Sequence, residues 1–179
     1  RILIPITIQI NSNNMLGIVR FAKNGMGNET FRPVVFMPKN LIIIRAGFRG
    51  GRAEFVSIFA DIFSPMETMI GFFEQLKPFG IPTCVFSNTN EIAVGHIREG
   101  FPFYSQFDNY VLSYEEGGMK PDEPIYDVVE KRTGESGAAI LYIDDRPENI
   151  ETGKGRGWQT ILQDDEAASV ATAEALLGI

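Results

Sequence analysis

The stretch Thr83-Cys84-Val85-Phe86-Ser87-Asn88-Thr89-Asn90 decides the fold of this chain. Its apolar first half follows Pro82 and ends abruptly in four small polar residues. A short apolar run with such punctuation is typical of a buried strand. In a parallel sheet, Ser87 and Asn88 would lie at the carboxyl end of that strand, where open α/β sheets bind ligands. Taken alone, the stretch fits a plainer role equally well, in which Asn88 or Thr89 caps the next helix.

From residue 53 onward, helix-like and strand-like segments alternate. Apolar residues at helical spacing indicate helices at 55–62, 64–76 and 124–129. A helix-like segment at 91–99 and an Ala-rich segment at 167–177 indicate two more. Short apolar runs indicate strands at 83–86, 110–112, 140–143 and 160–162. This alternation predicts an α/β fold with a doubly wound, mainly parallel Rossmann-like sheet.

Charge suggests how the chain is organised. Residues 1–52 hold eight of the 16 basic side chains and one of the 23 acidic ones, so the remainder holds eight basic and 22 acidic side chains. We interpret 1–52 as an atypical basic N-terminal segment that supplies a core strand, from 33–36 or 41–44. We interpret 53–80 as a reduced helical cap with a linker helix, and 81–179 as the α/β core.

Composition narrows the classes of partner. The basic side chains of residues 1–52 are scattered, without interleaved aromatic residues, and the remainder is acidic, so no nucleic-acid partner is expected. A single cysteine cannot form an internal disulfide, which favours a reducing, cytoplasmic setting. No apolar run is long enough to span a bilayer, so no membrane partner is expected. The oligomeric state stays open.

Two further polar stretches follow Ser87 in order. Lys120 and Pro121 lie on a Gly-rich loop, and Asp144 and Asp145 end the apolar run 140–143. A strand ending in Ser, a loop Lys-Pro and a strand ending in Asp-Asp resemble the second, third and fourth motifs of the haloacid dehalogenase-like (HAD) hydrolase superfamily. The resemblance covers residues 53–163, and the lead-in 112–115 is similar to its branch of small-molecule phosphatases and dehalogenases.

The resemblance implies a magnesium-dependent phosphatase that acts on a small phosphorylated metabolite. It assigns catalytic and phosphate-binding roles to Ser87 and Lys120, with Asn88 as a further phosphate contact. It also assigns magnesium to the acidic fourth motif. Because neighbouring strand residues point to opposite sides, we expect Asp145 to ligate the metal directly and Asp144 to orient a loop, with Asn149 in the outer shell. A polar turn whose Asp caps the helix at residue 147 is the alternative.

The first motif of that superfamily, an Asp-x-Asp pair after the first strand, is absent from the sequence. No Asp precedes Asp61, and the nearest stand-in, residues 34–39, has Met37 and Lys39 where the carboxylates would stand. Three interpretations stay open: a pseudoenzyme that binds phosphorylated ligands, a truncated or mis-framed hydrolase, or a hydrolase with another nucleophile. An interaction module without magnesium affinity is the alternative from a different class.

The basic residues near the stand-in also bear on magnesium. Either run expected to supply the core strand ends near a cation, Lys39 or Arg45. Beside Asp144 and Asp145, such a cation would offset their repulsion in place of the metal. The sequence therefore predicts weakened or lost magnesium binding, with Lys39 favoured over Arg45.

Overall fold

The computed structural model describes residues 4–6, 50–60 and 65–179. The chain forms two compact units: Arg1–Ile10 together with Ser64–Ile179, and Asn11–Phe63. In the second unit, the structure describes helix α2 (Arg52–Ala60). The first unit contains α3 (Glu67–Leu76). The segment 53–80, predicted as one region, is therefore divided between the two units.

Five parallel strands form the sheet of the first unit, in the order β3-β2-β1-β4-β5. The strands are β1 (Ile4–Ile6), β2 (Thr83–Ser87), β3 (Asn109–Leu112), β4 (Leu141–Asp144) and β5 (Gln159–Leu162). In register, Ile6 of β1 lies opposite both Val85 of β2 and Ile143 of β4. The expected Rossmann-like, parallel α/β sheet is confirmed.

The central strand differs from the expectation. The place between β2 and β4 is taken by Ile4–Ile6, and neither 33–36 nor 41–44 was needed to fill it. Both of those runs, together with Lys39 and Arg45, lie outside the described residues. The prediction considered only apolar runs close in sequence to the motifs, whereas the strand that the sheet uses lies well before both runs.

The helices of the first unit follow the strands in sequence. They are α3, α4 (Glu91–Gly100), α5 (Ser113–Glu116), α6 (Glu123–Thr133), α7 (Pro147–Gly155) and α8 (Glu166–Leu177). Short 3-10 turns lie at η1 (Lys77–Phe79), η2 (Pro102–Gln106) and η3 (Gly137–Ala139). Helix α3 begins at Glu67 with Met66 at its N-cap, later than the sequence pattern indicated.

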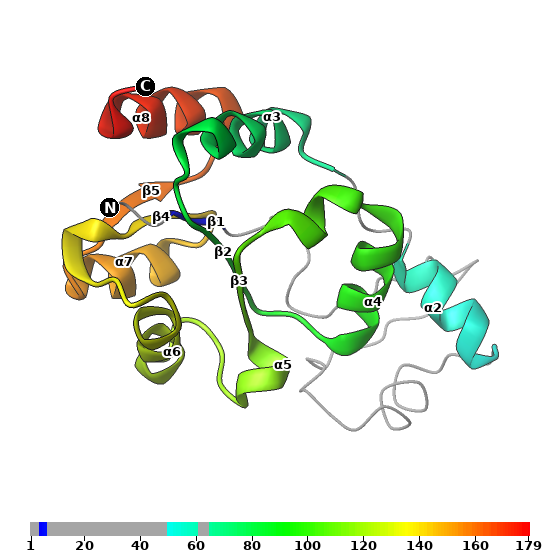
Figure 1. The fold of residues 1–179 in the computed structure, drawn as a ribbon. Helices are drawn as coiled ribbons and strands as arrows, with labels where there is room; N and C mark the ends of the chain where they lie inside the picture. Colours follow the sequence, from blue (N-terminus) through cyan, green and yellow to red (C-terminus); the bar gives the residue numbers. More distant parts are fainter. Residues whose placement is uncertain (1–3, 7–49, 61–64) are drawn as a thin grey trace, which may run out of the picture. The chain divides into compact units, whose positions relative to one another are not determined.

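Helices cover both faces of the sheet. Helices α3 and α8 lie side by side on one face, and α6 and α7 lie on the opposite face (Figure 1). On the α6–α7 face, ten buried side chains form one core cluster: Cys84, Phe86, Val111, Ile125, Tyr126, Val129, Ile140, Tyr142, Ile150 and Trp158. Because β2 and β4 are buried along their whole length, their carboxyl ends are held at a fixed place, which is what a binding site at that edge requires.

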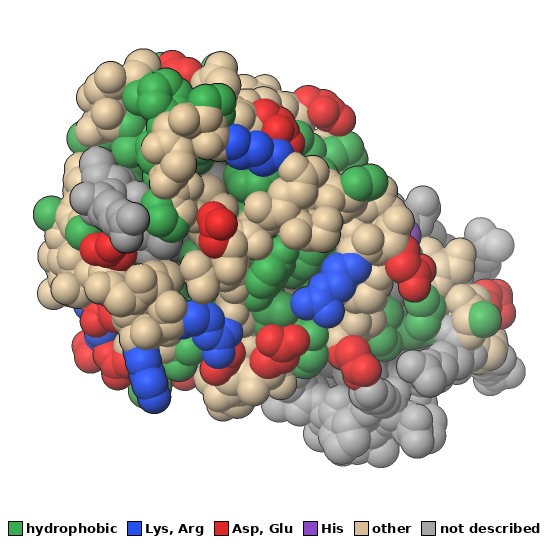
Figure 2. All heavy atoms as spheres, in the orientation of Figure 1, with side chains coloured by type: hydrophobic (Ala, Val, Ile, Leu, Met, Phe, Trp, Pro, Cys, Tyr) green, Lys and Arg blue, Asp and Glu red, His purple; other side chains and the backbone are tan. Residues whose placement is uncertain are grey.

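The described surface carries mixed charge. On the face shown in Figure 2, blue Lys and Arg side chains are interspersed with red Asp and Glu side chains rather than gathered into one basic area. Among the described residues, no helix combines the length and the apolar character needed to cross a membrane.

Candidate functional site at the carboxyl edge of the sheet

The carboxyl ends of β2 and β4 bring the predicted site residues to one edge of the sheet. Ser87 is the last residue of β2 and Asp144 the last of β4, and both are buried. Lys120 reaches the same edge from the loop before α6, because its Nζ donates to the carbonyl oxygen of Phe86 at 2.9 Å. The structure therefore brings Ser87, Lys120 and Asp144 to one edge of the sheet, and Asp145 directly follows Asp144 there.

Lys120 and Asp144 form a buried ion pair. The Lys120 Nζ lies 2.6 Å from Oδ2 of Asp144, and the two side chains are 3% and 0% exposed. The same Oδ2 accepts a hydrogen bond from the Tyr142 hydroxyl at 2.7 Å. Oδ1 accepts from the backbone N–H of Arg146 and from the side-chain amide of Asn149, both at 2.9 Å. Four donors therefore surround one carboxylate, which suits it to holding the loop rather than to binding a metal.

Electrostatics at the pair follow from burial and from these bonds. Burial alone would raise the pKa of Asp144, but the Lys120 charge and the hydrogen bonds outweigh it and hold this pKa below its usual value. Burial lowers the pKa of Lys120, and the Asp144 carboxylate offsets part of that effect. The Lys120 ammonium also lies over the rings of Phe86 and Tyr142, at 4.8 Å and 5.7 Å from their centroids.

Asn88 binds the backbone of Lys120. Its amide nitrogen donates to the carbonyl oxygen of Lys120 at 2.8 Å, and its amide oxygen accepts from the N–H of Lys120 at 2.8 Å. This pair of bonds ties the loop after β2 to the loop that carries the lysine. The side chain predicted as a phosphate contact is therefore engaged in placing Lys120.

The cap of helix α4 is Asn90. Its side-chain oxygen accepts hydrogen bonds from the N–H groups of Ile92 and Ala93, both at 3.0 Å. The capping role considered for Asn88 or Thr89 thus belongs to the next polar residue. Neither Ser87 nor Asn88 therefore caps helix α4.

Asp145 differs from its neighbour. It directly follows β4 and is exposed, whereas Asp144 is buried. Asn149 is buried and donates to Asp144, so it supports that carboxylate. Within 4–6, 50–60 and 65–179, no group of three or more His, Cys, Asp or Glu side chains has the arrangement of a metal site.

Ser113 and Tyr142 are polar contributors that the sequence analysis did not assign. Ser113, at the start of α5, exchanges hydrogen bonds with the backbone of Thr89. Tyr142 precedes Asp144 by two residues, so strand alternation places both side chains on one face and would have revealed it. Ser113 follows β3 directly, a position at the same sheet edge as Ser87, which was the available signal.

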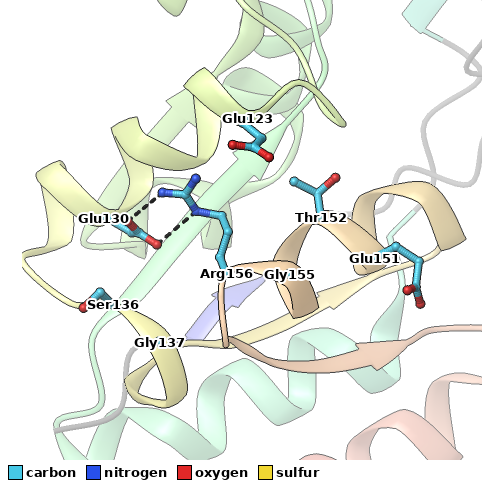
Figure 3. Close-up of a pocket in the computed structure, with 8 residues that line it drawn as sticks. All are labelled: Glu123, Glu130, Ser136, Gly137, Glu151, Thr152, Gly155 and Arg156. Carbon is cyan, nitrogen blue, oxygen red and sulfur yellow. Dashed lines mark hydrogen bonds and ion pairs between the residues drawn. The ribbon is translucent and has the colours of Figure 1, made fainter.

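A pocket lies elsewhere in the same unit. Its volume is about 800 Å³, and its lining comes from α6, the η3 region and α7 (Figure 3): Glu123, Glu130, Ser136, Gly137, Glu151, Thr152, Gly155 and Arg156. Arg156 is paired with Glu130 across it, with Nη2 of the arginine 2.7 Å from Oε2. None of the predicted site residues lines this pocket.

Comparison with solved structures supports the fold. A predicted HAD-like family hydrolase from Porphyromonas gingivalis superposes with a TM-score of 0.66 at 21% identity, over 78% of this chain and 71% of that one. A HAD family enzyme from Bacteroides thetaiotaomicron, solved in complex with magnesium and inorganic phosphate, superposes with a TM-score of 0.61 at 20% identity, over 67% and 64%.

Curated relatives and a family model extend the comparison. The sesquiterpene phosphatase astK of Aspergillus oryzae is 26% identical over 114 residues, 64% of this chain and 58% of that protein. Acyl-CoA dehydrogenase family member 10 of Mus musculus is 31% identical over 108 residues, 58% of this chain and 10% of that protein. The chain therefore spans less than two thirds of either relative. Residues 33–157 match the model for haloacid dehalogenase-like hydrolases, and we conclude that the chain belongs to this family.

Proposed function

We propose that the carboxyl edge of the sheet binds the phosphoryl group of a small phosphorylated molecule, as the substrate site of a phosphoric monoester hydrolase does. The observation that carries the proposal is the buried Lys120 ammonium, held between Asp144 and the end of β2. A cation fixed away from water attracts a phosphoryl group more strongly than a mobile surface lysine, because its position costs no reorganisation. The phosphate complex of the Bacteroides enzyme and the phosphatase activity named for the Aspergillus relative support this assignment.

Each polar residue at the edge has a distinct proposed task. Ser87 donates its hydroxyl to a phosphoryl oxygen, and Lys120 offsets the negative charge of the bound group. Asn88 holds the Lys120 backbone in place through its two hydrogen bonds. Asp144 accepts a hydrogen bond from the Lys120 ammonium and so holds this side chain. Hydrogen bonds from Tyr142, Arg146 and Asn149 in turn hold the carboxylate of Asp144.

Magnesium fits this edge through Asp145. Mg²⁺ in proteins is commonly held by one or two carboxylates, several waters and the phosphate of the substrate. Asp145 is exposed beside the ion pair, whereas both oxygens of Asp144 already accept hydrogen bonds. We propose Asp145 as the protein ligand and Asn149 as support through Asp144. When bound, the metal would neutralise charge on the phosphoryl oxygens.

Hydrolysis through an aspartyl intermediate requires a carboxylate nucleophile as well. No Asp precedes Asp61 in the sequence, and the eight residues that follow β1, 7–14, contain neither Asp nor Glu. We therefore propose binding as the activity of this chain, with hydrolysis no faster than in a Lys120→Ala, Asp145→Ala double variant.

We also propose that Asn11–Phe63, which lies between β1 and α3 in the sequence, is inserted where a specificity cap would be. We further propose that the protein works in a reducing, cytoplasmic setting, with Cys84 a buried thiol.

Calorimetry with inorganic phosphate in the presence of Mg²⁺ tests the binding proposal. We expect saturable binding that Ser87→Ala weakens roughly ten- to hundredfold, since one hydrogen bond to a charged group contributes roughly 1.5–3 kcal/mol. Ser105→Ala is the matched control, because this exposed hydroxyl bonds only the nearby carbonyl oxygen of Pro102 among the described residues. Absence of phosphate binding by the unaltered chain would overturn the proposal.

The turnover of p-nitrophenyl phosphate tests the second part separately. Binding without turnover supports the proposal for this chain. A magnesium-dependent rate that disappears in the Lys120→Ala, Asp145→Ala variant would instead identify it as an active phosphatase.

A further inference from the structure

Ser113 fixes the backbone of the loop between β2 and α4. Its hydroxyl oxygen accepts a hydrogen bond from the N–H of Thr89 at 2.9 Å and donates to the carbonyl oxygen of the same residue at 3.0 Å. One buried side chain therefore engages both polar backbone groups of Thr89. Because one hydroxyl oxygen bonds both the N–H and the carbonyl oxygen of this residue, the two bonds restrict both the position and the orientation of its peptide groups.

The Thr89 side chain shows that this loop conformation has a cost. Thr89 is 5% exposed, and its Oγ1 has no hydrogen-bond partner among the described residues. A buried hydroxyl without a partner is unfavourable, and such groups are rare in folded proteins. The two bonds to Ser113 therefore hold Thr89 where its own hydroxyl is unsatisfied.

The neighbouring residue of the loop is tied to the lysine. Asn88 makes its two hydrogen bonds with the backbone of Lys120, and Ser87 directly precedes it. The three loop ends at this sheet edge, after β2, after β3 and before α6, are thus connected through successive residues 88 and 89. A shift at Thr89 would be transmitted to the Ser87 hydroxyl and, through Asn88, to Lys120.

We propose that Ser113 is a positioning residue for phosphate binding, which holds the Ser87–Thr89 loop so that Ser87 and Lys120 address the same phosphoryl group. The proposal rests on the proposed function, since it concerns the same site. Ser113 acts through Thr89 and does not touch the ligand. Its contribution is to remove the freedom of the loop before binding, so that the ligand does not have to order it.

The test compares phosphate affinity in Ser113→Ala, Ser113→Thr and the unaltered chain, with inorganic phosphate and Mg²⁺ in a calorimeter. We expect Ser113→Ala to weaken binding about tenfold, the lower end of the effect seen when a supporting residue is removed. Ser113→Thr keeps the hydroxyl and should recover most of the affinity. If Ser113→Ala is unfolded at the assay temperature, Ser113→Cys, with a weaker donor and acceptor, should show the same direction of change.

The matched control is Thr83→Val, at the amino end of β2. The Thr83 hydroxyl is also buried and donates to Oδ2 of Asp108 at 2.9 Å, so its loss destabilises β2 without touching the carboxyl edge. We expect Thr83→Val to lower the urea midpoint and leave phosphate affinity unchanged. Equal weakening by both variants, or unchanged affinity in Ser113→Ala, would overturn the role of Ser113. Absence of binding by the unaltered chain would overturn the proposed function itself.

Discussion

The Nζ of Lys120 lies 2.6 Å from Oδ2 of Asp144, although the two residues are 24 positions apart in sequence. The same nitrogen donates to the carbonyl oxygen of Phe86, so one ammonium group joins β2, the loop before α6 and β4. Because both side chains are buried, neither charge can be compensated by water if its partner is removed.

Single substitutions in this pair should therefore destabilise the fold strongly. We expect Lys120→Met or Asp144→Asn alone to lower the free energy of unfolding by about 3–5 kcal/mol, because each leaves an uncompensated buried partner. The double variant should lose clearly less than the sum of the two, since it leaves no unpaired charge. Urea unfolding measures all three differences. Additive losses would show that the pair does not interact in the folded protein.

Replacing each of the two adjacent carboxylates by an amide should change a different property of the protein. Asp145→Asn removes an exposed charge, so the free energy of unfolding should stay within about 0.5 kcal/mol of the unaltered chain. It should, however, remove the effect of Mg²⁺ on phosphate affinity, if Asp145 is the metal ligand. Asp144→Asn, the matched control one residue away, should lose stability instead. The proposed division of roles fails if magnesium strengthens phosphate binding equally well in Asp145→Asn.

We expect the stability of the protein to depend on the protonation state of Glu130. The fluorescence of Trp158 should report that protonation state. Its Oε1 accepts a hydrogen bond from Nε1 of Trp158 at 2.9 Å, and the Arg156 guanidinium bonds both carboxylate oxygens. The hydrogen bonds from Arg156 and from Trp158 hold the pKa of Glu130 below its usual value. The stability they contribute is therefore fully present above the ordinary glutamate pKa and is lost as pH falls through the lower, folded-state value.

Trp158 is the single tryptophan of the chain, so its fluorescence follows this interaction directly. We expect an acid transition in the native state at a pH below the ordinary glutamate range, absent in Glu130→Gln. Glu123→Gln, at the start of the same helix α6, is the control and should keep the transition. A transition at or above the ordinary glutamate pKa would contradict the assignment.

Two glycines of α7 should differ sharply in their tolerance of a methyl group. A Cβ at Gly153 would lie 3.0 Å from Cδ1 of Tyr142 and 3.3 Å from Cγ2 of Thr160, whereas a Cβ at Gly155 would meet no atom of the described residues within 4 Å. Gly153→Ala should therefore destabilise the protein by about 1–3 kcal/mol through overpacking. Gly155→Ala should be neutral or slightly stabilising, because alanine favours helix. Thermal unfolding compares the two, and equal changes would contradict the close packing of α7 on β4 and β5.

The sequence alone determined the alternating strands and helices from residue 83 onward. Each of β2 to β5 contains a short apolar run, α4 and α6 carry helical spacing, and α8 is rich in alanine, so the local sequence was sufficient. The order of the polar stretches, together with the rule that ligands bind at the carboxyl edge of such sheets, placed Ser87 and Lys120 at one edge with the acidic pair 144–145. Strand alternation predicted that the two acidic side chains point to opposite sides, and only the structure shows that Asp144 is the buried one.

Only the tertiary structure decided which partners those side chains take. The central strand came from Ile4–Ile6, because neighbouring strands of a parallel sheet need not be close in sequence. The bonds from Asn88 to Lys120 and from Ser113 to Thr89 join residues 32 and 24 positions apart. Periodicity along the chain reports which face of an element is buried. The choice of a hydrogen-bond partner depends on how loops from different strands meet, and that is set by the packing of the whole sheet.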